Sequence, residues 1–140
     1  MREFSCGIKI EFDAAHRVIG HHNKCQYVHG HRYALHVQAS SKQLDGLGMV
    51  VDFGFLKKTI KNWIDDNFDH TAILSIEDAE LGLAISLITN QKIYYLPFNP
   101  TAENIAYYIK SKILPELIDS KDFYISSVKL YETPNCYALV

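Results

Sequence analysis

The sequence predicts an α+β fold in which strands lie at both ends of the chain and amphipathic helices lie between them. Apolar and polar residues alternate over residues 6–13, 31–40 and 126–131, which is the period of a strand with one buried face. Apolar residues recur at helical spacing over 53–68 and 101–117. Regular strand–helix–strand alternation is missing, which favours an antiparallel sheet covered by helices on one face. The open face of such a sheet favours oligomerisation.

The first two strands are expected to form a neighbouring antiparallel pair, because consecutive strands usually lie side by side. Apolar residues stand at even positions from Cys6 to Phe12 and at odd positions from Tyr33 to Ala39. Between the strands, residues 17–28 are polar and show no clean period, which predicts a loop.

The two main helices have recognisable starts. Asp52 is expected to cap a helix that runs to about residue 68, and Thr101 a second helix that runs to Leu117. Pro115 is expected to end or kink the second helix. The remaining elements are predicted to be a shorter helix over 77–90 with Leu81, Ile85 and Ile88 on one face, a short strand over 93–96, a break from Pro97 to Pro100, and a final strand over 137–140.

Length and composition are those of one globular domain spanning residues 1–140. Apolar residues make up 48% and charged residues 21% of the 140, and the formal net charge is −2 without any basic run. This argues against general nucleic-acid binding, and no apolar stretch reaches the ~20 residues of a membrane span. The first residues lack a signal-peptide pattern, and Cys6, Cys25 and Cys136 are odd in number and far apart, so we expect a cytoplasmic protein without a disulfide framework.

Five of the seven histidines lie between residues 16 and 31. His29 and His31 are two residues apart at the start of a strand, so their imidazoles leave the same face. His16 closes the preceding strand, which is expected to be the neighbour of this one. The pattern therefore predicts three imidazoles around one zinc ion, with a fourth position open to water or substrate, as in catalytic zinc sites.

Other interpretations of these residues stay open. A lone His-x-His pair is a weak signal, and His21, His22 and His36 are interpreted as loop or surface residues. Cys25 lies four residues before His29 and allows two interpretations. It is either a fourth, closing ligand of a structural zinc, or a thiol near a cation that acts as a base or nucleophile.

Further candidates follow the second half of the chain. Asp69 and His70 form a carboxylate–imidazole pair that can carry protons, although such a pair is often an exposed or capping one. Glu132 ends an apolar strand as a solvated carboxylate or as an acceptor at a pocket floor. Thr101 and Glu103 are explained by helix capping and the helix dipole, and are kept as candidate substrate-binding residues.

With these residues in hand, the chain resembles the 6-pyruvoyl-tetrahydropterin synthase / 6-carboxy-tetrahydropterin synthase family. The matching segments run in family order over nearly the whole chain: residues 12–17 (FDAAHR), 25–33 (CQYVHGHRY), 48–53 (GMVVDF), 56–57 (LK), 69–70 (DH), 100–104 (PTAEN) and 131–133 (YET).

The resemblance implies the tunnelling fold, a four-stranded antiparallel sheet with two helices on one face. Subunits of this fold associate into a β-barrel, typically as a homo-hexamer of two stacked trimers. The resemblance also implies the roles of the candidate residues: His16, His29 and His31 as zinc ligands, Cys25 as general base, Asp69 and His70 as a proton-transfer pair from a neighbouring subunit, and Glu132 as the anchor of the pterin ring.

The implied substrate is 7,8-dihydroneopterin triphosphate. The spacing of Cys25 and His29 is similar to that of the bacterial branch, which makes 6-carboxy-5,6,7,8-tetrahydropterin on the route to queuosine. The alternatives are the pyruvoyl synthase, which eliminates triphosphate, and a non-catalytic pterin-binding oligomer. The stretch over 75–99 looks longer than in compact bacterial members.

Overall fold

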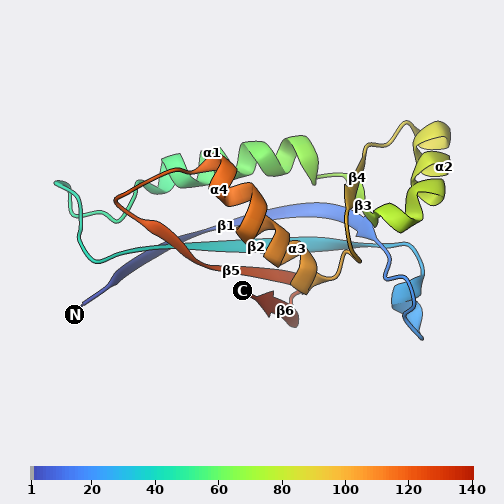
Figure 1. The fold of residues 1–140 in the computed structure, drawn as a ribbon, viewed down its shortest axis with the longest axis horizontal. Helices are drawn as coiled ribbons and strands as arrows, with labels where there is room; N and C mark the ends of the chain where they lie inside the picture. Colours follow the sequence, from blue (N-terminus) through green and yellow to red (C-terminus); the bar gives the residue numbers. More distant parts are fainter. Residues whose placement is uncertain (1) are drawn as a thin grey trace.

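The computed structural model describes residues 2–140 and shows a long, curled sheet with helices along one side (Figure 1). Four antiparallel strands form most of the sheet: β1 (Phe4–His16), β2 (His29–Ser41), β5 (Tyr124–Thr133) and β6 (Cys136–Leu139). Two further strands, β3 (Thr71–Ser75) and β4 (Ile93–Leu96), extend it to the order β4-β3-β1-β2-β5-β6.

The expectation of a four-stranded, purely antiparallel sheet is therefore wrong, because the sheet has six strands and two of its strand pairs are parallel. β3 lies parallel to the end of β1, and β4 lies parallel to β3. All five residues of β3 are buried, so this strand shows none of the alternation by which the others were predicted. The sheet is mixed, and its two parallel strands lie beside the end of β1 that carries His16.

The predicted pairing of the first two strands is confirmed. β1 and β2 are antiparallel over their whole length, from Phe4 opposite Ser41 to His16 opposite His29. Even positions of β1 and odd positions of β2 face the buried core, where Phe12 and Tyr33 are completely buried and stack with ring centroids 5.1 Å apart. Residues 17–28 connect the strands as a loop that contains one 3₁₀ turn, Lys24–Gln26.

The helices cover one face of the sheet (Figure 1). In α1 (Phe53–Asn67) the Asp52 side chain accepts from the Phe55 N–H, which confirms the predicted cap. α3 (Ala102–Tyr108) begins at the predicted cap Thr101 and continues through a π-helical turn (Ile109–Ile113) into α4 (Leu114–Leu117). The wide turn precedes Pro115, whose missing N–H and bulky ring disfavour a continuous α-helix.

The segment between β3 and β4 forms the 3₁₀ turn Ile76–Asp78 and then α2 (Ala79–Thr89), at the end of the sheet that carries the His16–His29 pair (Figure 1). This helix was predicted, but its expected apolar face is wrong at Ile88, which is 84% exposed. Apolar residues occur all around α2, so helical spacing alone does not define its buried face.

Across residues 2–140, no helix is both long and apolar enough to cross a membrane.

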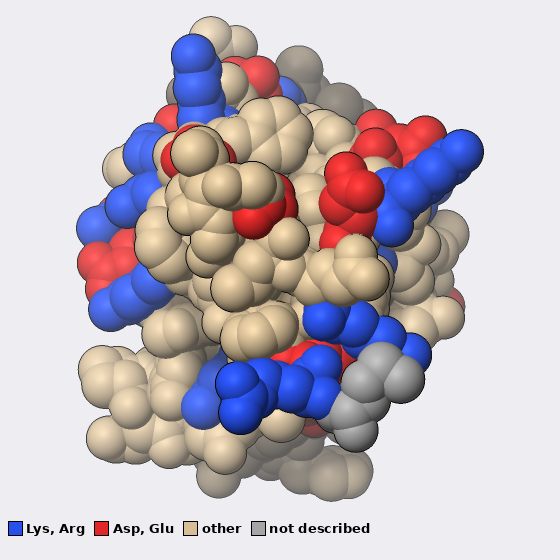
Figure 2. Space-filling view, turned by 90° about the vertical axis from the view of Figure 1, so that its left-hand side faces the viewer, with Lys and Arg blue, Asp and Glu red and all other residues tan. Residues whose placement is uncertain are grey.

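Charges of both signs share the surface at the end of the molecule shown in Figure 2. Lys and Arg side chains lie among Asp and Glu side chains there, around a broad uncharged area. Elsewhere the charges also pair, as in Arg32 with Asp13 at 2.9 Å and Lys61 with Asp65 at 2.6 Å. This mixed pattern differs from the continuous basic surface that is typical of general nucleic-acid binding.

Candidate metal centre

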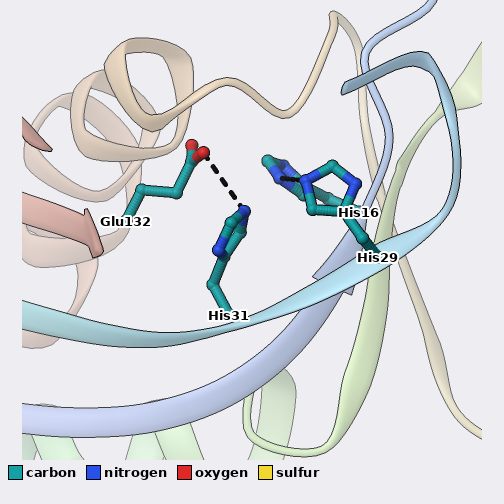
Figure 3. Close-up of side chains that lie close together, drawn as sticks. All are labelled: His16, His29, His31 and Glu132. Carbon is teal, nitrogen blue, oxygen red and sulfur yellow. Dashed lines mark hydrogen bonds and ion pairs between the residues drawn. The ribbon is translucent and has the colours of Figure 1, made fainter. Parts of the chain in front are cut away.

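Three histidines and one glutamate come together where β1 ends and β2 begins. His16, His29, His31 and Glu132 each offer a ligand atom, and these atoms all lie within 4.8 Å of one another. His16 comes from β1 and Glu132 from the end of β5, and the side chains point toward a common centre (Figure 3). The convergence predicted from the spacing of the three histidines is thus present.

Backbone carbonyl groups orient two of the imidazoles. His16 Nδ1 lies 2.7 Å from the Pro100 carbonyl oxygen, and His29 Nδ1 lies 2.6 Å from that of Tyr27. A carbonyl oxygen only accepts, so each Nδ1 donates its hydrogen, and in a neutral imidazole the lone pair is then on Nε2. Metal-bound histidines are commonly oriented by this type of contact.

The two Nε2 atoms of His16 and His29 are 3.1 Å apart. Two lone pairs at this distance repel each other unless a proton or a cation lies between them. In a tetrahedral zinc site with bonds of about 2.0–2.1 Å, ligand atoms lie about 3.3 Å apart. The observed separation is therefore suited to a shared zinc ion.

The third imidazole has a nitrogen with no hydrogen-bond partner in the described chain. His31 Nε2 is buried and lies 3.1 Å from Glu132 Oε1, but this contact lacks the alignment of a hydrogen bond. A buried nitrogen of this kind suits a metal ligand. Burial also lowers the pKa of His16 and of His31, because loss of solvent disfavours the imidazolium, and this favours the neutral form that binds metals. The residues present fit a zinc ion.

Tyr33 packs against the histidines, and its alternation with polar residues predicts a buried strand position. Its ring meets those of His16 and His31 edge to face, at centroid distances of 5.9 and 5.7 Å. Its hydroxyl is buried without a hydrogen-bond partner among residues 2–140, and burial followed by the nearby Glu132 carboxylate raises its pKa. The only signal in the sequence is a hydroxyl-bearing residue two positions after His31 on the buried face.

Cys25 lies on the 3₁₀ turn of the loop, and its carbonyl oxygen accepts from the Val18 N–H at 2.8 Å. Its thiol is partly buried. In the described chain, the group of close ligand atoms contains the Glu132 carboxylate and not the Cys25 sulfur. This geometry favours the interpretation of Cys25 as a thiol that is not a metal ligand over that of a closing fourth ligand.

Asp69 and His70 form a second group together with Asp13, separate from the four residues around the histidines. The Asp13 N–H donates to Asp69 Oδ1 at 3.0 Å, and His70 Nδ1 lies 3.0 Å from Asp69 Oδ2. His70 has φ 58°, a left-handed conformation that non-glycine residues rarely adopt. Its N–H donates to the Asp13 carbonyl oxygen at 2.6 Å, and its imidazole is 77% exposed.

The two candidate substrate-binding residues at the start of α3, Thr101 and Glu103, have different surroundings. The Thr101 hydroxyl accepts from the Asn104 N–H at 3.1 Å as a helix cap, whereas Glu103 is exposed in the first turn of the helix. His21 and His22 are exposed, as expected for loop residues.

Replacing Asp69 with asparagine is expected to lower the pKa of His70. The hydrogen bond from His70 to the Asp69 carboxylate, and then the attraction between their charges, raise the pKa of His70, so the imidazolium persists to higher pH than usual. In Asp69→Asn the proton should be lost at lower pH. Titration of the His70 ring protons by NMR measures this, with the exposed His22 as internal control; an unchanged His70 titration would contradict the assigned pair.

Comparison with known proteins places this geometry in a family. The model of the 6-pyruvoyl tetrahydropterin synthase family matches residues 5–140. The chain is 55% identical over 135 residues to the 6-carboxy-5,6,7,8-tetrahydropterin synthase of Rickettsia bellii, covering 96% of this chain and 98% of that protein. It is 34% identical to the enzyme of the same name from Haemophilus influenzae, covering 96% of each chain.

Solved structures share the fold. An uncharacterized protein from Wolinella succinogenes matches with a TM-score of 0.78 at 23% identity, covering 100% of this chain and 98% of that one. The 6-pyruvoyl tetrahydropterin synthase of Caenorhabditis elegans matches with a TM-score of 0.70 at 24% identity, covering 100% and 96%. The chain belongs to the 6-pyruvoyl tetrahydropterin synthase family, which confirms the resemblance found in its sequence.

Proposed function

We propose that the chain is a zinc-dependent lyase that converts 7,8-dihydroneopterin triphosphate to 6-carboxy-5,6,7,8-tetrahydropterin, releasing acetaldehyde and triphosphate. The observation that carries the proposal is the approach of His16 Nε2 and His29 Nε2 to 3.1 Å, beside the unpartnered His31 Nε2. Relatives up to 55% identical bear the name of this enzyme, which supports the product and a place on the route to queuosine.

In the proposed site, His16, His29 and His31 hold the zinc ion. When bound, the ion would polarise the side-chain hydroxyls of the substrate and lower their pKa. Cys25 takes a proton from the substrate side chain, and His70, oriented by Asp69, returns one. Because Asp69 and His70 form a separate group within one chain, we propose that they serve the site of a neighbouring copy in a homo-hexamer.

Glu132 is proposed to anchor the pterin ring by accepting from its amino and ring N–H groups, with Thr101 and Glu103 at the rim. A carboxylate can accept two parallel hydrogen bonds, which suits this two-point contact. Its position 3.1 Å from His31 Nε2 would bring the ring next to the metal centre.

We expect Glu132→Gln to lower kcat/KM by about 10- to 100-fold, because a charge-assisted hydrogen bond contributes about 1.5–3 kcal/mol, and to retain zinc. Steady-state kinetics and metal analysis measure this. Glu116→Gln, an exposed carboxylate on α4, is the control. Loss of zinc from Glu132→Gln would instead identify Glu132 as a metal ligand and contradict the anchoring role.

Incubation of the zinc-loaded protein with 7,8-dihydroneopterin triphosphate tests the function. Mass spectrometry should find 6-carboxy-5,6,7,8-tetrahydropterin, and acetaldehyde should be released. The name of the matching family model favours a second candidate, the pyruvoyl synthase, which would release triphosphate without acetaldehyde. Absence of turnover at full zinc content would refute both and leave a pterin-binding oligomer.

A further inference from the structure

The loop between His16 and His29 is held by a partly buried ion pair with the segment that precedes α2. Arg17 Nε lies 2.7 Å from Asp78 Oδ2, and Arg17 Nη2 lies 2.5 Å from Asp78 Oδ1. The Asp78 side chain is only 6% exposed. Two parallel charge-assisted bonds fix the plane of the guanidinium, which a single contact would not do.

This ion pair connects to the turn that carries Cys25. The third nitrogen of the guanidinium, Arg17 Nη1, lies 3.5 Å from the Gln26 carbonyl oxygen. The next residue, Val18, donates its N–H to the Cys25 carbonyl oxygen at 2.8 Å. Two successive carbonyl groups of the turn therefore contact two successive residues that directly follow β1, and Asp78 binds the first of them, Arg17.

A second contact holds the same loop from the other end of the segment. The Asn99 side chain accepts from the Ile19 N–H at 3.0 Å and donates to the Ile19 carbonyl oxygen at 2.9 Å. Asn99 precedes Pro100, whose carbonyl oxygen accepts from His16. The position of the loop therefore depends on contacts with Asp78 and Asn99. Both residues lie in the stretch 75–99, to which the proposed chemistry gives no role.

We propose that Asp78 is a positioning residue for Cys25: through Arg17, it holds the thiol-bearing turn in the orientation needed for proton transfer. This inference rests on the proposed function, in which Cys25 is the base. Proton transfer requires the thiol to lie within hydrogen-bond reach of the substrate, and a displacement of about 1 Å can lower a rate by about 100-fold.

The test compares Asp78→Asn with Glu80→Gln in the zinc-loaded full chain. Glu80 is an exposed carboxylate in the first turn of α2, close after Asp78 in the chain, so Glu80→Gln removes the same charge from the neighbouring turn. For Asp78→Asn we expect the rate of Cys25 alkylation by iodoacetamide to rise at least fivefold, because the partly buried thiol is released. We also expect kcat to fall about tenfold or more, with KM within twofold, and zinc content and Cys136 alkylation to stay unchanged. Glu80→Gln should match the wild type in every measurement.

Site-resolved mass spectrometry follows both thiols without substrate, so the alkylation result does not depend on the proposed reaction. A wild-type rate of Cys25 alkylation and a wild-type kcat in Asp78→Asn would overturn the positioning role. If Asp78→Asn fails to fold, Arg17→Lys decides in its place, since lysine keeps the charge but loses the two-pronged contact and the reach to Gln26. An unchanged Cys25 alkylation rate in Arg17→Lys would overturn the proposal, whereas absence of wild-type turnover would refute only the proposed function.

Discussion

Replacing Cys25 with alanine is expected to lower turnover by about 10²- to 10⁴-fold, the usual contribution of one general acid or base, and to leave the metal bound. The physical reason is the position of the thiol. Cys25 lies on a turn of the loop, and its sulfur is not among the close ligand atoms, so the substitution removes the proposed proton acceptor without removing a member of that group. Single-turnover kinetics with 7,8-dihydroneopterin triphosphate and metal analysis of the same samples measure the two effects separately.

The chain offers a matched control for this variant in Cys136, an exposed thiol in β6. Cys136→Ala removes the same functional group far from the loop in sequence, and should keep full activity and full zinc content. If Cys25→Ala loses its zinc, the sulfur is a ligand, and the interpretation as a structural zinc site would replace the catalytic one.

Most of the candidate metal centre could be predicted from the sequence because it depends on local periodicity. Two residues on one face of a strand and a third at the end of its antiparallel neighbour are brought together by strand geometry alone. The register that places His16 opposite His29 is one in which the two buried faces coincide. The group formed by His16, His29 and His31 is therefore present where their spacing predicts it.

The features that the sequence did not reveal depend on long-range packing. The backbone carbonyl groups of Pro100 and Tyr27 orient the imidazoles of His16 and His29. Every residue has a backbone carbonyl group, so the amino-acid sequence cannot show which ones make these contacts. The Arg17–Asp78 pair joins residues 61 positions apart and forms because α2 packs where it does. The strand Thr71–Ser75 was missed for the related reason that complete burial removes its alternation.

Replacing His29 with alanine is expected to remove the metal together with turnover. An ion that binds only the folded chain stabilises it by about 4 kcal/mol at 1,000 times its dissociation constant. For a chain of this size that corresponds to a rise in Tm of about 10 °C. We expect the wild type to show a rise of this order when zinc is added to chelator-treated protein, and His29→Ala to show almost none.

His29 is better suited to this test than His16, because its ring is only partly buried and its truncation leaves a smaller cavity. His36 supplies the control: it is also a partly buried histidine of β2, but on the opposite face of the strand, and His36→Ala should keep the full zinc-dependent rise in Tm. Differential scanning calorimetry with and without zinc measures all three proteins. An equal rise in Tm for His29→Ala and the wild type would show that zinc does not bind between the Nε2 atoms of His16 and His29.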